Sequence, residues 1–125
     1  MEAGVNSRLD EIHAAILRVK LPYLDDNNKK REFIASTYNE YLDVSIGRPI
    51  ERRKCNHVYH LYVITIDKRD KVLEYLRQNN VYAGVHYTLP AHLHPGLSAA
   101  VKIVSELKYT ESICQRIISL PIYPE

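Results

Sequence analysis

Gly4-Val5-Asn6-Ser7-Arg8-Leu9-Asp10-Glu11-Ile12, followed by Ala14-Ala15, has the composition of a capped helix start. The amide of Asn6 or the hydroxyl of Ser7 can accept a hydrogen bond from a free backbone N–H of the first turn. Ser7 and Asp10 also have the spacing of a capping box. Apolar residues then recur on one helical face, at Leu9, Ile12, Ile16 and Val19. The segment predicts an amphipathic helix from about residue 7 to residue 21.

Asn6 and Arg8 stand beside this helix N-terminus, where two interpretations are open. A helix start presents free backbone N–H groups and the positive end of the helix dipole, so it can bind an anion such as a phosphate. The two side chains can add donors to such a site. Alternatively, this segment is only a well-capped amphipathic helix, which is the interpretation that the spacing alone favours.

The bulk composition excludes several classes of protein. With 46% hydrophobic and 26% charged residues, the 125-residue chain has the composition of one soluble globular domain. Its net charge of +2 is too small to indicate a nucleic-acid partner. No apolar run has the length of a membrane helix or the pattern of a signal peptide. Cys55 and Cys114 do not suggest a disulfide framework, and we expect a cytoplasmic location.

Periodicity predicts helices around a small sheet. A second helix is expected from Pro22 to Leu42, a strand from His57 to Ile66, a helix from Asp67 to Asn79, and a short strand from Val81 to Tyr87. The expected buried faces of the two helices are Ile34, Ala35, Tyr38, Tyr41 and Leu42, and then Val72, Leu73 and Leu76. Many of the ten tyrosines are expected at half-buried positions or at interfaces, because a buried tyrosine needs a partner for its hydroxyl. The fold class is α/β, of the α+β type, with a small sheet covered by helices.

The motifs resemble those of a known family. Gly-x-Asn-x-Arg-Leu-Asp-Glu-Ile resembles the opening of the C-terminal small domain in the DegT/DnrJ/EryC1/StrS family, which consists of PLP-dependent aminotransferases acting on nucleotide-linked keto sugars. The resemblance continues through the chain, except at residues 96–108. The further matching residues are Arg31, Ala35 and Tyr38, the strand Val58–Ile64, the Gly-x-His-Tyr-x-x-Pro-x-His loop Gly84–His92, and the Leu-Pro-x-x-Pro tail that ends at Pro124.

The resemblance implies roles for individual residues. Asn6 would reach the phosphate of pyridoxal 5'-phosphate bound by the neighbouring subunit of a homodimer. Arg8 would meet the same phosphate or pair with an acidic side chain. His86, Tyr87 and His92 would contact the sugar nucleotide, although His86 could instead be a strand-end histidine bonded to backbone.

The family's Schiff-base lysine and the acid facing the pyridine nitrogen lie in a large N-terminal domain, which nothing in residues 1–125 resembles. We therefore expect the single small domain of a sugar aminotransferase, truncated at both ends and inactive alone. The parent would move an amino group, commonly from glutamate, to a keto-sugar nucleotide. Its product would serve polysaccharide, lipopolysaccharide or glycosylated-metabolite synthesis. The small domain would then have the fold of its counterparts in the fold-type I PLP-dependent transferases.

Other readings of the sequence stay open. The chain could be a stand-alone ligand-binding or protein-interaction domain without catalysis. Zinc is weakly suggested by Cys55-x-His57-x-x-His60 and by His86 with His92-x-His94, but His57 and His60 point to opposite faces of a strand and paired zinc spacings are absent. The basic loop residues Arg48, Arg52, Arg53 and Lys54 are either a solvated surface or a contact for a substrate pyrophosphate.

Overall fold

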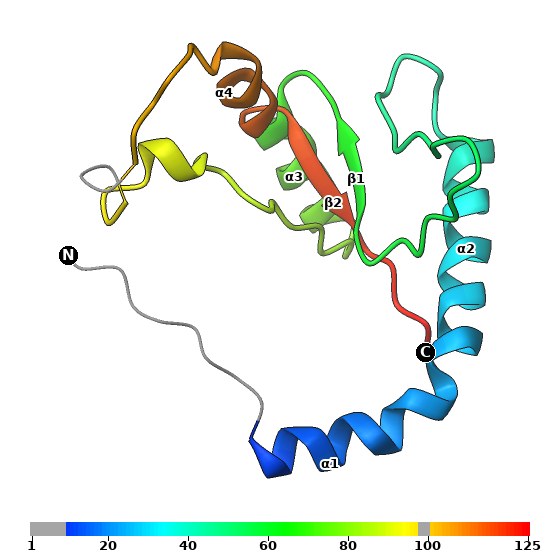
Figure 1. Ribbon diagram of the computed structural model, residues 1–125. Helices are drawn as coiled ribbons and strands as arrows, with labels where there is room; N and C mark the ends of the chain where they lie inside the picture. The colour runs from blue at the N-terminus through cyan, green and yellow to red at the C-terminus, as the bar shows by residue number, and fades with distance from the viewer. Residues whose placement is uncertain (1–9, 98–100) are drawn as a thin grey trace.

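The computed structural model describes residues 10–97 and 101–125 (Figure 1). The elements in order are α1 (Glu11–Lys20), a 3-10 turn η1 (Leu21–Tyr23), α2 (Leu24–Tyr41), β1 (Tyr62–Thr65), α3 (Arg69–Gln78), a 3-10 turn η2 (Ala91–Leu93), α4 (Lys108–Cys114) and β2 (Ile117–Leu120). None of the helices in these described residues combines the length and the apolar content that crossing a membrane requires.

A small antiparallel sheet lies at the centre of the molecule. Strands β1 and β2 pair with Tyr62 opposite Leu120 and Thr65 opposite Ile117. One further residue pairs at each edge: Gly47 bridges to Thr65 of β1, and Gly84 bridges to Ser119 of β2. Helix α2 runs along one side of the sheet, and α3 lies behind it (Figure 1). The predicted fold class, a small sheet covered by helices, is therefore confirmed.

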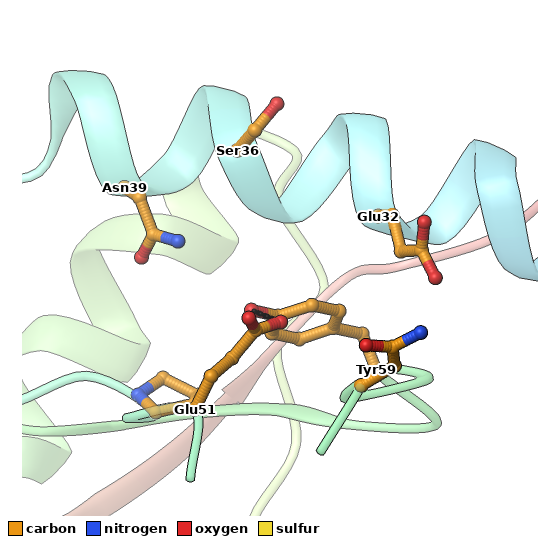
Figure 2. Close-up of a pocket in the computed structure, with 7 residues that line it drawn as sticks. Glu32, Ser36, Asn39, Glu51 and Tyr59 are labelled. Atoms are coloured by element: carbon orange, nitrogen blue, oxygen red, sulfur yellow. Dashed lines mark hydrogen bonds between the residues drawn. The ribbon is translucent and has the colours of Figure 1, made fainter. Parts of the chain in front are cut away.

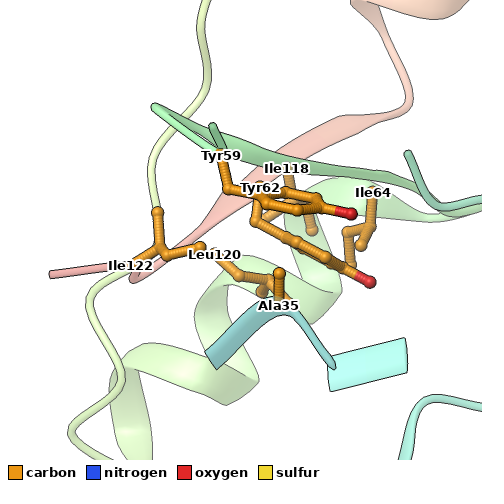
Figure 3. Close-up of a cluster of buried hydrophobic side chains, with 7 residues drawn as sticks. All are labelled: Ala35, Tyr59, Tyr62, Ile64, Ile118, Leu120 and Ile122. Atoms are coloured by element: carbon orange, nitrogen blue, oxygen red, sulfur yellow. The ribbon is translucent and has the colours of Figure 1, made fainter. Parts of the chain in front are cut away.

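The core forms where α2 meets the sheet (Figure 3). Ala35 on α2, Tyr62 on β1 and Ile118 on β2 are completely buried. The partly buried side chains that pack around this cluster are the ones that periodicity predicted: Ile34 and Tyr38 of α2, Leu42 just after it, and Val72, Leu73 and Leu76 of α3. Tyr41 was expected on the same face but is 78% exposed, because the apolar face of α2 does not extend to it.

Three tyrosines tie the core to its surroundings through their hydroxyl groups. Tyr62 donates to the side-chain oxygen of Asn39 over 2.6 Å, Tyr38 to the carbonyl of Pro121 over 2.7 Å, and Tyr59 to a carboxylate oxygen of Glu51 over 3.0 Å. Burial raises the pKa of each of the three phenols above its usual value. These three tyrosines have polar partners, as expected, but only Tyr38 of the ten is half-buried: Tyr59 and Tyr62 are buried, and the other seven are 63–79% exposed.

Helix α1 differs from its prediction in its start and its surroundings. It begins at Glu11, with Asp10 as the cap: a carboxylate oxygen of Asp10 accepts a hydrogen bond from the backbone N–H of His13 over 2.8 Å. Asn6 and Ser7, the predicted caps, lie outside the described residues. The predicted apolar face is present but uncovered, since Ile12 is 73% and Val19 is 70% exposed. Figure 1 shows α1 well apart from the sheet.

The strands also differ from their predictions. The first strand covers only Tyr62–Thr65, because Tyr59 has a positive φ of 47° that interrupts the extended run. Residues 81–87 pair with the sheet at Gly84 alone. Ile117–Leu120, for which the sequence predicted no strand, is strand β2.

The start of α3 is also different. The helix begins at Arg69, two residues later than predicted, and its N-cap residue is Lys68 in a left-handed conformation. The carboxylate of Asp67 lies outside the helix and pairs with Arg116 over 3.0 Å.

Candidate functional site

The predicted substrate loop is anchored to the edge of β2. The backbone N–H of Gly84 donates to the carbonyl of Ser119 over 3.0 Å, and the N–H of Ser119 donates to the carbonyl of Gly84 over 2.8 Å. Two residues later, Nδ1 of His86 lies 2.9 Å from the hydroxyl of Ser119. Tyr87 follows with its ring edge-on to the His86 ring at 5.7 Å and is 74% exposed. This pairing presents both predicted contact residues at the surface.

A pocket of about 210 Å³ lies beside His86. Its walls come from the chain before β1, from residues 82–86 and from β2 with the tail that follows it. They include His60, Tyr82, His86, Ser119, Leu120, Pro121 and Tyr123. The sequence predicted His86 here but gave no signal for Ser119, because residues 117–120 were not recognised as a strand.

His92, the third predicted contact residue, is placed differently. It lies in η2, is only 9% exposed, and its Nε2 is 3.1 Å from a carboxylate oxygen of Glu111 in α4. This contact ties the loop to α4, so His92 fixes the position of the segment that carries His86 and Tyr87. A direct contact between His92 and substrate stays a prediction, as it does for His86 and Tyr87.

The residues predicted to bind the cofactor, Asn6 and Arg8, lie outside the described part of the chain.

Lys29 and Lys30 border an open groove with Phe33, Ile34 and Tyr123. The Lys29 side chain is 75% exposed and its ammonium lies 3.4 Å from Asp26. A lysine that forms a Schiff base is normally activated by desolvation or by a cationic neighbour. Lys29 is exposed and pairs with an acidic side chain, so it does not fit the role of the Schiff-base lysine of PLP.

Four of the five histidines proposed as zinc ligands have other partners. His57 accepts from the backbone N–H of Tyr59 over 2.9 Å, and His94 accepts from that of Gly96 over 3.2 Å. His86 and His92 bond to Ser119 and Glu111. Across residues 10–97 and 101–125, no three histidine, cysteine or acidic side chains gather closely enough to hold a metal ion.

A second, polar pocket of about 480 Å³ lies between α2 and the loop before β1 (Figure 2). Its lining includes Glu32, Asn39, Glu51, Asn56 and Tyr59. The sequence did not predict this pocket.

Of the basic residues near this pocket, Arg48 donates to the backbone carbonyl of Asn39, whereas Arg52, Arg53 and Lys54 are exposed. Arg48 therefore stabilises the loop by bonding to α2, whereas the other three basic residues are exposed to solvent, as in a solvated surface loop.

Comparison with known proteins decides the family. The sequence profile of the DegT/DnrJ/EryC1/StrS aminotransferase family matches residues 1–125. The chain belongs to this family. Among curated relatives, it is 38% identical over 122 residues to a dTDP-3-amino-3,6-dideoxy-alpha-D-galactopyranose transaminase of Aneurinibacillus thermoaerophilus. That match covers 97% of this chain but 33% of the relative, so the chain spans about a third of the relative's length.

Solved structures of aminotransferases contain the same fold. The chain superposes with a TM-score of 0.86 and 34% identity on DesV of Streptomyces venezuelae, solved in complex with a ketimine intermediate. The match covers 98% of this chain and 33% of DesV. The structure of ntda from Bacillus subtilis with the bound cofactor PMP gives a TM-score of 0.78 at 29% identity, covering 97% of this chain and 29% of ntda. This member of the DegT/DnrJ/EryC1/StrS family thus matches about one third of the length of each of these aminotransferases.

Proposed function

We propose that residues 1–125 form the C-terminal small domain of a PLP-dependent aminotransferase that acts on a keto-sugar nucleotide. The parent enzyme transfers an amino group, commonly from glutamate, to the sugar. Its product serves the synthesis of a polysaccharide, a lipopolysaccharide or a glycosylated metabolite. The observation that carries this proposal is the match of nearly the whole chain to one third of a nucleotide-sugar transaminase.

The exposed face of α1 supports the view that the chain is part of a larger protein. Three large apolar side chains, Ile12, Ile16 and Val19, lie on one face of this ten-residue helix and are between 49% and 73% exposed. A contiguous apolar surface on a soluble protein usually marks an interaction site. We propose that the rest of the polypeptide, which the relatives have and this chain lacks, covers that face.

The proposed division of labour follows from which groups this chain supplies. PLP, when bound, supplies the electron sink for amino transfer. Every lysine among the described residues is exposed, and none is desolvated as a Schiff-base lysine normally is. We therefore assign that lysine to the rest of the polypeptide and expect no transamination by this chain alone. Asn6 and Arg8 would add donors to the cofactor phosphate, as the resemblance to the family implies. His86 and Tyr87 would meet the sugar nucleotide in a cytoplasmic homodimer.

The size of the native polypeptide tests whether the chain is a domain of an enzyme. An antibody raised against residues 101–125 would be used on extracts of the source cells. Because the chain is 14.5 kDa and spans about a third of its relative, we expect a product about three times that mass. A product of 14.5 kDa would overturn the proposal in favour of a stand-alone binding or interaction domain.

The cofactor role of Asn6 is tested in that full-length protein. Replacing Asn6 with Ala removes a neutral donor to a charged phosphate, an interaction worth about 1.5–3 kcal/mol. PLP affinity, measured by reconstituting the apoenzyme, should fall about tenfold or more. Asn27→Ala in α2 is the matched control and should leave PLP affinity unchanged. Equal PLP affinity in the Asn6 and Asn27 variants would refute the role of Asn6.

A further inference from the structure

Ser119 is a buried polar side chain in an otherwise apolar strand. It is 5% exposed, and its neighbours Ile117, Ile118 and Leu120 in β2 are all buried. Its backbone N–H and carbonyl are both used by the bridge to Gly84. Burying a hydroxyl without a partner costs free energy, so its oxygen must be bonded. The partner is Nδ1 of His86, at 2.9 Å.

A serine hydroxyl is suited to hold an imidazole in one orientation whatever its protonation state. It donates to Nδ1 when that nitrogen is unprotonated, and it accepts from Nδ1–H when the nitrogen carries a proton. The contact therefore fixes the ring without fixing its charge. A carboxylate at the same place would favour the imidazolium.

Gly84 restricts the same ring from another side. A Cβ at position 84 would lie 3.0 Å from Cε1 of His86, closer than side-chain carbons normally approach. The ring is thus packed over the backbone of Gly84 while Ser119 holds Nδ1. Among the described residues no hydrogen-bond partner is found for Nε2, and His86 lines the pocket of about 210 Å³ beside His60, Tyr82 and Tyr123. Nε2 is therefore the ring nitrogen available to a ligand.

We propose that Ser119 is a positioning residue for His86: together with the space left by Gly84, it fixes the ring so that Nε2 can bond to a hydroxyl or phosphate oxygen of the sugar nucleotide. This inference rests on the proposed function for the nature of the ligand. The serine–histidine contact itself is independent of that function. Ser119 acts through His86 and does not itself touch substrate.

The first readout needs no ligand. In the full-length holoenzyme labelled with 15N-histidine, the ring signals of His86 are identified by their loss in His86→Ala. Ser119→Ala should shift the Nδ1 signal, because the hydrogen bond at Nδ1 is gone. Ser119→Thr keeps the hydroxyl and should retain the wild-type signals. Unchanged His86 signals in Ser119→Ala would overturn the inference.

The second readout is binding of dTDP-glucose and UDP-N-acetylglucosamine as probes, measured by calorimetry. Ser119→Ala and His86→Ala should each weaken binding of the probe, raising its Kd five- to tenfold. The double variant should bind no more weakly than His86→Ala, because the two residues act as a unit. Additive losses would overturn the inference. Ser112→Ala, on the exposed surface of α4, is the control and should bind as the wild type does.

Gly84→Ala perturbs the His86 ring while leaving the Ser119 side chain in place. It therefore tests the same positioning with a second variant, in case Ser119→Ala fails to fold. It should shift the His86 signals and weaken probe binding as Ser119→Ala does. If Ser119→Ala shifts the ring signals but the wild-type enzyme binds neither probe, the proposed function fails while the serine–histidine contact is confirmed. If the wild type binds a probe and Ser119→Ala binds it equally well, the positioning role is refuted and the proposed function stands.

Discussion

Tyr62 allows the contributions of a ring and of a hydroxyl to be measured separately at one completely buried position. Its ring packs between Tyr38, at 5.0 Å, and Tyr59, at 6.0 Å, while its hydroxyl reaches Asn39 on α2 over 2.6 Å. Tyr62→Phe removes only the hydrogen bond, whereas Tyr62→Ala removes the ring as well. The two variants therefore report on different parts of the same contact.

The expected magnitudes follow from the burial of each group. Asn39 is exposed, so water can replace the lost hydroxyl, and Tyr62→Phe should cost about 0.5–1.5 kcal/mol of unfolding free energy. Truncation of a fully buried aromatic ring leaves a cavity, so Tyr62→Ala should cost about 3–5 kcal/mol. Tyr75→Phe is the control, since Tyr75 on α3 is 65% exposed, and it should change stability by less than about 0.5 kcal/mol.

Urea unfolding followed by circular dichroism separates these cases. With a denaturant slope of about 1–3 kcal/mol/M, a loss of 1 kcal/mol lowers the urea midpoint by roughly 0.3–1 M. Tyr62→Phe should therefore remain folded with a lowered midpoint. Equal losses in Tyr62→Phe and Tyr62→Ala would refute the reasoning, because the ring would then contribute nothing to the core. A loss in Tyr75→Phe as large as that in Tyr62→Phe would also refute it.

Three further predictions concern the turn before β1, the tyrosine cluster and the start of α1. A Cβ at position 47 would overlap the Thr65 hydroxyl, so Gly47→Ala should lower the free energy of unfolding in urea by about 1–3 kcal/mol. If the clash is the cause, adding Thr65→Ala should recover part of that loss, and no recovery would count against it. Burial raises the pKa of Tyr38, Tyr59 and Tyr62, so the unfolded chain releases these protons first as pH rises past 10.0. Stability should therefore be intact below pH 10.0 and fall above it, more steeply than in a triple Phe variant; parallel curves would contradict this. The hydrogen bond from the His13 N–H lowers the pKa of Asp10, so its cap is present above pH 3.8 and is lost as pH falls further; Asp10→Ala should lower helix content in far-UV circular dichroism at neutral pH, and an unchanged spectrum would argue against the cap.

Helix positions and buried faces were predictable where one periodicity acts over many residues. Ala35 and Tyr38 on α2, and Leu73 and Leu76 on α3, pack against the core as their spacing indicated. The apolar face of α1 was also predicted, but none of the described residues, 10–97 and 101–125, covers it. The sequence pattern could not show this. Periodicity identifies the apolar face of a helix, not what packs against it.

The sheet was harder to predict, because its strands are short and depend on distant partners. Ile117–Leu120 has four consecutive buried residues, a pattern that a helix end and a central strand share. Only pairing with β1 on one side and with Gly84 on the other distinguishes the strand. For the same reason, the sequence identified His86 by its motif but could not identify Ser119, which takes its role from that pairing.

The pairing of β1 with β2 also sets an order of events during synthesis. The two strands are separated by about 50 residues of chain, so β1 leaves the ribosome well before its partner exists. Helices α2 and α3 depend on local contacts and can form in that interval, whereas the sheet must wait and then close a long loop. Until then, the apolar face of α2 and the unpaired edge of β1 are exposed in the nascent chain, which is when aggregation competes with folding. Translation speed between the codons for Ile66 and Ile117 should therefore influence how much of this protein reaches its native state.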